Sequence, residues 1–460
     1  MINNYKKIKE LLNDKQTGPI FFVAPNPNRA IGVEKEVKNY HIICSQKTDI
    51  IDYLNKEKIS VLCLDDDNIK NSGKLLEDKK ILSYIKRKSK GKIANIMTFK
   101  PSPKIAKLCN NNGFKYLGNK WELNRKLEDK IEFVRITEKL KIPNAKSKII
   151  TLEEKKDGDF KLKKGKKFVI QLPRGFSGNS TFLIKTEKDL KKIVKKHRNR
   201  KIKLSEYING DVYTINACVG KFGVLISQPI FQITGLTDYN KNELGTCGND
   251  YAYGEKLESG EKKKIFNYTK KVGSYMKKTG YNGIFGLDFI VSGDNVDLME
   301  INPRFVSSIP VFTKLQIQKE PAPFLFFHLT EFLKTDYKFK LSSSYQSSFA
   351  KWNKEKSFNF SQLILRNTNE NCVKIIKSMI SGVYKIEKEK LILKEKTYYA
   401  ENLKENEFLI QAVKRGSLIN SDMEYANIQV GYGIMKDGKK FKSCFDRIIN
   451  LVLKNIKISI

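Results

Sequence analysis

The hydrophobic positions of the first 118 residues form short apolar runs that lysine-rich helical patterns separate. These runs cover residues 19–24, 40–44 and 59–64. Runs of this length between helical segments are typical of buried strands in an α/β unit with a parallel sheet. No Gly-x-Gly-x-x-Gly motif follows the first run, so a dinucleotide site is not indicated. We therefore expect a Rossmann-like N-terminal domain over residues 1–118.

Between residues 119 and 335 helical and strand-like patterns alternate along the chain. Strand-like runs cover residues 146–150, 167–171 and 228–232, and helical patterns cover 121–140, 260–279 and much of 305–333. The stretch 235–254 is polar and contains glycines, which indicates a loop. We expect these segments to form a second domain over residues 119–335.

From about residue 336 the pattern changes to short strand-like runs between polar turns. The clearest runs are 362–366, 382–386 and 408–413. They predict a β-rich C-terminal domain over residues 336–460, and a multidomain fold of mixed α/β and α+β class for the whole chain. No catalytic set of residues is visible in this last domain. We expect it to serve as a lid or dimerisation surface, with substrate recognition as the alternative.

The composition is that of a globular protein, but the net charge is unusual. The 460 residues are 40% hydrophobic and carry a formal charge of +37. A strongly basic chain suggests nucleic-acid or anionic-membrane binding. Its lysines, however, are spread along the entire sequence, and no nucleic-acid motif accompanies them. We interpret them as solvated surface and expect neither a specific nucleic acid nor a membrane as partner.

Cysteine and histidine offer no chemistry of their own. The seven cysteines are scattered without a Cys-x-x-Cys pair, and the three histidines are isolated. This pattern argues against a disulfide framework, a zinc site and histidine-based catalysis. The longest apolar stretch, near residues 323–330, is too short to span a bilayer, and the start of the chain looks like an amphipathic helix without an apolar leader. We expect a cytoplasmic protein.

The most informative segment is 280–305, which has the pattern of a β-hairpin around the turn at 292–295. That turn would place Asp288 almost opposite Glu300, with the two carboxylates on one face. Alternation along the strand then puts Asn302 and Arg304 on the same face. Oxygen ligands suit Mg²⁺, and an arginine can bind a phosphate or carboxylate. The alternative is a surface hairpin whose polar face is merely solvated.

A second candidate is the loop after the strand 167–171, which ends in Gln171. The loop contains Gly175, Ser177 and Gly178. Glycine permits close approach of backbone N–H groups to an anion, so this loop could cover phosphate oxygens. A hairpin turn is an equally good interpretation of the segment taken alone.

The hairpin resembles the metal-binding hairpin of the ATP-grasp family, whose members activate carboxylates with ATP. In that family an acidic residue is followed after about a dozen residues by Glu-x-Asn and a basic residue. The chain matches this pattern at Asp288, Glu300, Asn302 and Arg304. The resemblance includes the branch that contains carbamoyl-phosphate synthase and biotin carboxylase. It implies that Asp288, Glu300 and Asn302 hold the metal, and that Arg304 orients the substrate carboxylate.

The resemblance extends to a nucleotide site spread through the preceding residues. It implies that Lys130 reaches the ATP phosphates, that the strand at Gln171 and the loop with Gly175, Ser177 and Gly178 cover them, and that Glu206 precedes an adenine hinge at Tyr207 and Ile208. Two positions depart from the family pattern. Gln171 stands where a lysine is common, so Arg174 or Lys130 would have to supply its charge. Val212 stands where an acid would hold the ribose, and the adjacent Asp211 could replace it only if a bulge turned it to that face.

The function implied is an ATP-dependent ligase that activates a carboxylate as an acyl phosphate and joins it to an amine. Its cofactors would be ATP and Mg²⁺, with two ions expected and Mn²⁺ as an alternative. Its partners would be small carboxylate and amine substrates, and a homodimer is compatible with it. One alternative is a bicarbonate-activating enzyme of the carboxylase or carbamoyl-phosphate synthase type. Another is a basic nucleic-acid-binding protein with a degenerate ATP site.

Overall fold

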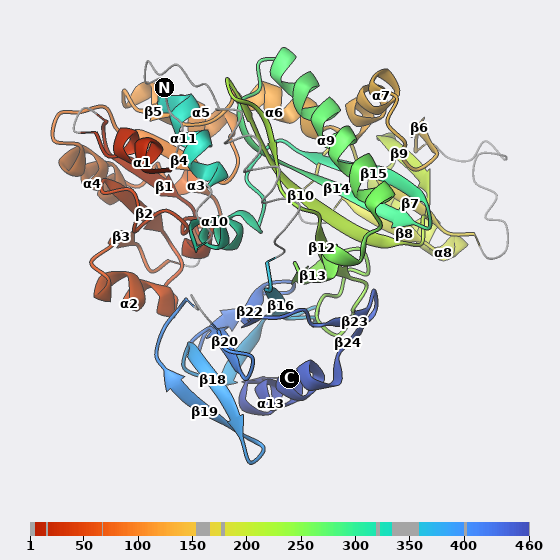
Figure 1. The fold of residues 1–460 in the computed structure, drawn as a ribbon. Coiled ribbons are helices and arrows are strands. Elements are labelled where there is room, and N and C mark those ends of the chain that lie inside the picture. The colour runs from red at the N-terminus through yellow and green to blue at the C-terminus, as the bar shows by residue number, and fades with distance from the viewer. Residues whose placement is uncertain are drawn as a thin grey trace.

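The structure is a computed structural model of the 460-residue chain. It describes residues 5–14, 17–66, 68–152, 166–175, 180–318, 323–333, 358–399 and 403–459. The chain forms an N-terminal part, a middle part and a C-terminal part, and helix α10 (Ile309–Gln318) lies where the three meet (Figure 1). None of the helices in these ranges is long and apolar enough to cross a membrane.

The N-terminal part is a parallel five-stranded sheet in the order β3-β2-β1-β4-β5; the apolar runs predicted the parallel sheet and its first three strands but not β4 and β5. All four residues of β1 are buried, with Ile20 and Phe22 in one core and Phe21 and Val23 in another. Since side chains alternate along a strand, both faces of this sheet are covered. The strands are β1 Ile20–Val23, β2 Tyr40–Cys44, β3 Ser60–Cys63, β4 Asn95–Thr98 and β5 Lys115–Tyr116. The helices are α1 Tyr5–Leu12, η1 Pro27–Arg29, α2 Asp49–Lys56, α3 Ser72–Leu75, α4 Lys79–Ser89 and α5 Pro103–Asn111.

The middle part begins with two helices and a small antiparallel sheet in the order β6-β9-β7-β8. The predicted helix over 121–140 is interrupted at Asp129, whose backbone is extended and whose side chain caps the second helix. Helix α8 covers the small sheet through Leu190 and Ile193. The helices are α6 Trp121–Glu128, α7 Lys130–Leu140 and α8 Glu187–His197. The strands are β6 Ser147–Thr151, β7 Phe168–Gln171, β8 Thr181–Ile184 and β9 Lys201–Glu206.

A large sheet carries the rest of the middle part and continues into the C-terminal part. Its order is β15-β14-β10-β12-β13-β16-β22-β20-β18-β19, with β11 paired to β10. Helix α9 (Ser259–Lys278) packs on one face with Val272 and Met276, and α11 (Phe324–Leu333) packs against β14 and β10. The strands before residue 310 are β10 Asp211–Gly220, β11 Gly223–Ile226, β12 Ile230–Thr234, β13 Thr246–Asp250, β14 Gly283–Ser292 and β15 Asn295–Asn302.

The stretch 235–254 is not simply a loop, because it contains β13 and a short 3₁₀ helix η2 (Tyr253–Lys256). Strand β13 pairs with β16 through Gly248 and Leu363. A Cβ atom at Gly248 would lie 2.0 Å from the carbonyl oxygen of Gln362. The glycine that suggested a loop therefore permits close approach of two strands.

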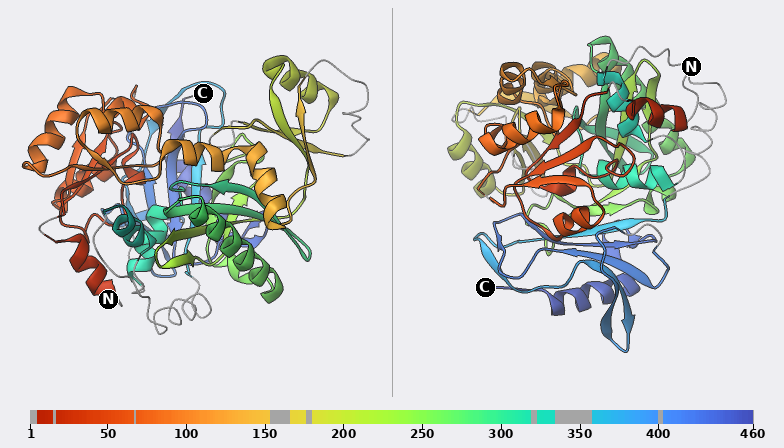
Figure 2. Two further views of the ribbon diagram at one scale, coloured as in Figure 1. Left: turned by 90° about the horizontal axis from the view of Figure 1, so that it is seen from above. Right: turned by 90° about the vertical axis from the view of Figure 1, so that its left-hand side faces the viewer.

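The C-terminal part is β-rich, as predicted, and its sheet continues that of the middle part. The predicted domain boundary near residue 335 falls in 334–357, outside the described residues. Figure 2 shows these strands below the N-terminal part, with a final helix that the sequence pattern did not predict. The elements are β16 Ser361–Arg366, β17 Val373–Lys377, β18 Gly382–Glu387, β19 Lys390–Glu395, β20 Glu407–Ala412, β21 Leu418–Ile419, β22 Glu424–Val430, β23 Met435–Asp437, β24 Lys440–Phe441, α13 Ser443–Asn455 and β25 Lys457–Ile458.

Candidate active site

The predicted hairpin is formed by β14 and β15, and Asp288 lies directly opposite Glu300. A β-bulge follows, so that Phe289 pairs with Leu298 and Met299 is the extra residue. The bulge keeps Leu298 and Ile301 in the core, both almost fully buried, while Met299 is only half-buried. The two carboxylates therefore share one face of the sheet, as the sequence predicted.

Hydrogen bonds join the polar row of the hairpin into one network. Asn302 donates Nδ2 to Asp288 Oδ2 at 2.9 Å. Arg304 donates Nη2 to Asn302 Oδ1 at 2.8 Å and Nε to Glu128 Oε1 at 3.3 Å. Gln232, on β12, donates Nε2 to Asp288 Oδ1 at 2.7 Å. Gln232 was not recognised from the sequence, since it reaches this face only through the pairing of β12 with β10.

The two carboxylates are held in different electrostatic states. Burial and the neighbouring Glu300 charge raise the pKa of Asp288 to about 6. Burial also acts to raise the pKa of Glu300, but the charge of Lys130 and its hydrogen bond outweigh burial and lower it. Lys130 and Glu300 form an ion pair. The pair thus combines one strongly ionised carboxylate with one that gives up its proton near neutral pH.

Lys130 reaches this face because α7 begins with it. The interruption at Asp129 turns the chain, and the Lys130 N–H donates to the Pro173 carbonyl at 2.9 Å. Its side chain is 4% exposed, although a lysine on a lysine-rich helix is usually solvated. The sequence resemblance implied that Lys130 reaches the ATP phosphates, and the structure places its ammonium against Glu300 of the hairpin.

An unexpected lysine lies beside Gln171. Lys203, on β9, pairs directly with Gln171 on β7 and is 1% exposed. Burial, reinforced by Lys130 and partly opposed by Glu300, lowers the pKa of Lys203 to about 8. Its ammonium lies 4.7 Å from the centre of the Phe133 ring, and within the described ranges no carboxylate forms an ion pair with it. Lys203 therefore places on the neighbouring strand the charge that Gln171 lacks.

The glycine-containing loop is described only at its ends. Gly175 lies against Ser180, where a Cβ atom would meet the Ser180 hydroxyl oxygen at 1.8 Å. Ser177 and Gly178 lie outside the described residues. Arg174 is exposed, whereas Gln171 is buried and its Oε1 has no hydrogen-bond donor. Of the two residues considered to compensate for Gln171, only Lys130 is buried at the site.

The predicted hinge follows β9 at the edge of the same region. Glu206 is exposed, and Tyr207 and Ile208 are half-buried. The Tyr207 N–H donates to the Lys167 carbonyl at 3.2 Å. In the described part of the chain, no backbone carbonyl accepts the Ile208 N–H. That group could therefore recognise the edge of a base.

Asp211 does not belong to this site, which corrects one sequence prediction. Strands β10 and β14 pair without a bulge, so Thr214 opposite Asp288 faces the site and Asp211 opposite Val291 faces away. Asp211 instead lies against Gly438 of the β23–β24 hairpin, and burial together with Asp437 raises its pKa. Val212 shares the face of Thr214 but has no polar group to offer a ribose.

The residues that the structure brings together are those of a recognised domain. Residues 117–308 match the family model of an ATP-grasp domain, which confirms the resemblance seen in the sequence. The matched range contains Lys130, Lys203, Asp288 and Glu300, and it excludes most of the N-terminal part and all of the C-terminal part.

One curated relative covers part of the chain. The arginine-specific large chain of carbamoyl phosphate synthase from Geobacillus stearothermophilus is 23% identical over 208 residues, which is 44% of this chain. The chain spans 19% of the length of that relative.

Solved structures resemble nearly the whole chain at low sequence identity. The biotin carboxylase domain of Hydrogenobacter thermophilus 2-oxoglutarate carboxylase is 14% identical, covers 96% of this chain and 91% of its own, and superimposes with a TM-score of 0.59. N5-carboxyaminoimidazole ribonucleotide synthetase from Thermotoga maritima is 12% identical, with coverage of 96% and 99% and a TM-score of 0.54. Phosphoribosylamine–glycine ligase from the same organism is 14% identical, with coverage of 96% and 97% and a TM-score of 0.56. These likenesses confirm the predicted multidomain α/β and α+β fold.

Proposed function

Because residues 117–308 are an ATP-grasp domain, we propose that this chain is an ATP-dependent ligase that activates a carboxylate and joins it to an amine. The observation that carries the proposal is the convergence of Lys130 and Lys203 on the Asp288–Glu300 pair. The carboxylates can bind divalent metal ions, and the lysines beside them can bind the phosphate groups that such ions accompany.

The side chains present fit Mg·ATP. Among the residues that the structure describes, no carboxylate pairs with the buried Lys203 cation, and such a charge is costly unless an anion joins it. Asp288, Glu300 and Asn302 offer oxygen ligands on one face. In the described residues no cluster of three or more His, Cys, Asp or Glu side chains could hold a metal by itself. Phosphate oxygens and water would therefore complete the coordination of Mg²⁺, with two ions expected and Mn²⁺ as an alternative.

In the proposed reaction a substrate carboxylate oxygen attacks the γ-phosphorus of ATP, and ADP leaves. The amine nitrogen then attacks the carbonyl carbon of the acyl phosphate, loses a proton and displaces phosphate. Mg²⁺ would neutralise the phosphate charge. Lys130 and Lys203 would hold the phosphates from the side of the small sheet, and Tyr207 and Ile208 would hold the base. Arg304, fixed by Asn302 and Glu128, would orient the carboxylate.

The decisive test of the metal assignment is Glu300→Gln, with ADP release measured over pooled carboxylates and amines. The variant keeps the shape of the side chain but removes the charge that pairs with Lys130. We expect turnover to fall by roughly two orders of magnitude or more, while circular dichroism stays near that of the wild type; the unfolding midpoint should fall, because Lys130 is left buried without its partner. Near-normal turnover would contradict the assignment. Asp297→Asn, on the same strand but half-buried and away from the network, is the matched control.

Bicarbonate activation is the second candidate, because a relative and two similar structures are named for carboxylating or carbamoyl-forming enzymes. ADP release that depends on bicarbonate and needs no organic carboxylate would favour it. A nucleic-acid-binding protein with a degenerate ATP site would instead show salt-resistant, sequence-selective binding and no affinity for Mg·ATP. A homodimer and a cytoplasmic location stay predictions, and light scattering of the purified chain tests the first.

A further inference from the structure

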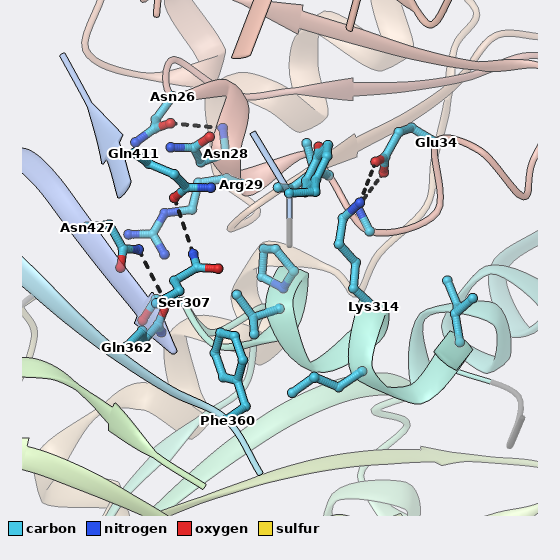
Figure 3. Close-up of a pocket in the computed structure, with 18 of the residues that line it drawn as sticks. Asn26, Asn28, Arg29, Glu34, Ser307, Lys314, Phe360, Gln362, Gln411 and Asn427 are labelled. Atoms are coloured by element: carbon cyan, nitrogen blue, oxygen red, sulfur yellow. Dashed lines mark hydrogen bonds and ion pairs between the residues drawn. The ribbon is translucent and has the colours of Figure 1, made fainter. Parts of the chain in front are cut away.

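A cavity of about 350 Å³ lies where the N-terminal part, helix α10 and the C-terminal sheet meet (Figure 3). All three parts contribute to its lining. Pockets of this size hold small organic molecules rather than single ions. The cavity is distinct from the Asp288–Glu300 pair but lies close to the end of the same hairpin, since Ser307 is part of its wall.

Two chemically different walls face each other across this cavity. Carboxamide side chains of the C-terminal strands form the polar wall: Gln362, Gln411, Asn427 and Gln429. Asn427 donates to Gln362 at 3.4 Å, a pair that Figure 3 shows, and Gln429 donates to Gln411 at 3.3 Å. Helix α10 supplies apolar surface through Val311 and Leu315. A ligand that fits has both polar groups and a hydrocarbon part.

Three cations and three carboxylates line the cavity, and within the described residues Arg29 is the one among them that forms no ion pair; Lys35 pairs with Glu57 and Glu36 with Lys9 outside the lining. Glu34 pairs with Lys314 at 2.9 Å, and Glu424 pairs with Arg366 at 3.1 Å. Arg29, at the end of the short helix η1, lines the same cavity. In the described ranges no side chain or carbonyl accepts a hydrogen bond from its guanidinium, although Glu424 is near enough to raise its pKa against the lowering effect of burial. A planar guanidinium without an acceptor is suited to bidentate binding of a carboxylate.

The Arg29 guanidinium shares an aromatic neighbour with the catalytic candidate Arg304. The Arg29 guanidinium carbon is 5.0 Å from the centre of the Phe99 ring, and that of Arg304 is 5.5 Å from the same ring. Both cations therefore contact one aromatic side chain. The Arg304 charge also helps to lower the pKa of Arg29, so an anion bound to Arg29 would be attracted by both cations.

Acceptor atoms without donors complete the picture. Asn28 and Asn427 both line the cavity, and the Oδ1 atom of each is buried and receives no hydrogen bond from the part of the chain that the structure describes. Unsatisfied buried acceptors are unfavourable, so a ligand with N–H groups would stabilise them.

We propose that this cavity binds an amino acid whose carboxylate pairs with Arg29 and whose amine is held by amide oxygens. Resting on the proposed ligase function, the inference adds that this carboxylate is the group that becomes phosphorylated. The C-terminal sheet then recognises the substrate, rather than serving only as a lid or dimer surface.

Hydroxylamine tests this directly, because it traps an acyl phosphate. The carboxylate oxygen takes the γ-phosphoryl group and ADP leaves; the hydroxylamine nitrogen then attacks the carbonyl carbon, loses a proton and releases phosphate. The full chain is incubated with Mg·ATP, hydroxylamine and each common amino acid in turn, and the hydroxamate is identified by mass. We expect at least one amino acid to give a hydroxamate together with an equal amount of ADP.

Arg29→Met should raise the KM for that amino acid roughly 10- to 100-fold, since it removes a charged hydrogen bond. The KM for ATP should stay unchanged, which also shows that the variant folds. Arg29→Lys keeps the charge but lacks the paired N–H groups of the guanidinium. Its KM for the amino acid should therefore lie between those of the wild type and Arg29→Met. Arg87→Met, an exposed arginine of the same domain that does not line the cavity, is the matched control.

Three other results would each contradict either the cavity inference or the proposed function. If Mg·ATP binds but no amino acid yields a hydroxamate or a thermal shift, the cavity inference is wrong and the ligase proposal stands. If bicarbonate alone supports ADP release and the Arg29 variants leave it unchanged, the cavity does not hold the activated carboxylate. If Mg·ATP does not bind, the proposed function itself falls, and the cavity inference falls with it.

Discussion

Replacing Lys203 by methionine should stabilise the ligand-free protein and impair its use of ATP. The side chain is almost fully buried, and its pKa is lowered from 10.5 to about 8 by burial and by Lys130. At about 1.4 kcal/mol per unit, this shift corresponds to a penalty of roughly 3 kcal/mol for the charged form. Methionine removes that penalty and retains most of the apolar stem. It also loses the contact with the Phe133 ring, worth about 1 kcal/mol.

We therefore expect the free energy of unfolding at pH 7, measured by urea denaturation without nucleotide, to rise by about 2 kcal/mol. In the same variant the KM for ATP should rise roughly 10- to 100-fold, because a charged hydrogen bond to phosphate is lost. In the proposed complex with ATP, the phosphates would supply the partner that this buried cation lacks within the described residues. Lys201→Met, an exposed residue on the same strand, should change stability by less than about 0.5 kcal/mol.

The pH dependence gives this prediction a definite sign. Because the pKa of Lys203 is lower in the folded chain than in the unfolded one, folding penalises its protonated form. The penalty is complete below about pH 8 and disappears as pH rises towards 10.5, so the wild type should gain stability relative to the variant over that range. A variant that is less stable than the wild type at pH 7, with an unchanged KM for ATP, would refute the reasoning. The double variant Gln171→Lys/Lys203→Gln should bind ATP better than Lys203→Met, because it moves the positive charge only to the directly paired position on the neighbouring strand.

Three further predictions concern the frame that holds the site. His328 is buried, and burial lowers its pKa to about 4. The free energy of unfolding should therefore be highest above pH 6.5 and fall by up to about 1.4 kcal/mol per pH unit towards pH 4. His328→Gln should flatten that slope in urea titrations, and an unchanged slope would contradict the prediction. Gly248→Ala should destabilise the chain by about 1 to 3 kcal/mol, because its Cβ would meet the Gln362 carbonyl, whereas Gly260→Ala, with open space around it, should be neutral within about 0.5 kcal/mol. Gln232→Ala should weaken ATP use by roughly tenfold while leaving the fold intact, because it removes a hydrogen bond to Asp288, and an unchanged ATP KM would mean that the contact is only structural.

Local patterns predicted those features that depend on neighbouring residues. The N-terminal strands and the opposition of Asp288 and Glu300 follow from apolar runs and from one short turn. Lys203 could not be found this way, because Lys201 beside it gives the same local signal and only the register with β7 distinguishes them. Strand β13 was hidden because its glycine serves strand pairing rather than a turn.

The two faces of β10 show that a resemblance in sequence can also assign a residue to the site wrongly. Family position made Asp211 a candidate, and simple alternation placed it on the wrong face unless a bulge intervened. The ladder to β14 runs without a shift over its whole length, so alternation prevails. Where resemblance and strand geometry conflict, the pairing register decides which side chain reaches the site.

The continuous sheet connects the proposed nucleotide site to the proposed substrate cavity. Gln362 of the cavity wall donates to Asn249 of β13 at 3.3 Å, and β13 belongs to the same sheet as β10 and β14. Hydrogen-bonded strands cannot slide past one another by less than a full register step. The carboxamide wall and the Asp288–Glu300 pair are therefore positioned by one frame, so a substrate bound at Arg29 need not wait for the C-terminal part to close. A change that loosens the β13–β16 pairing should therefore raise the KM for the amino acid. It should leave the KM for ATP nearly unchanged, because Lys130, Lys203 and the hairpin lie on the other side of the β13–β16 pairing.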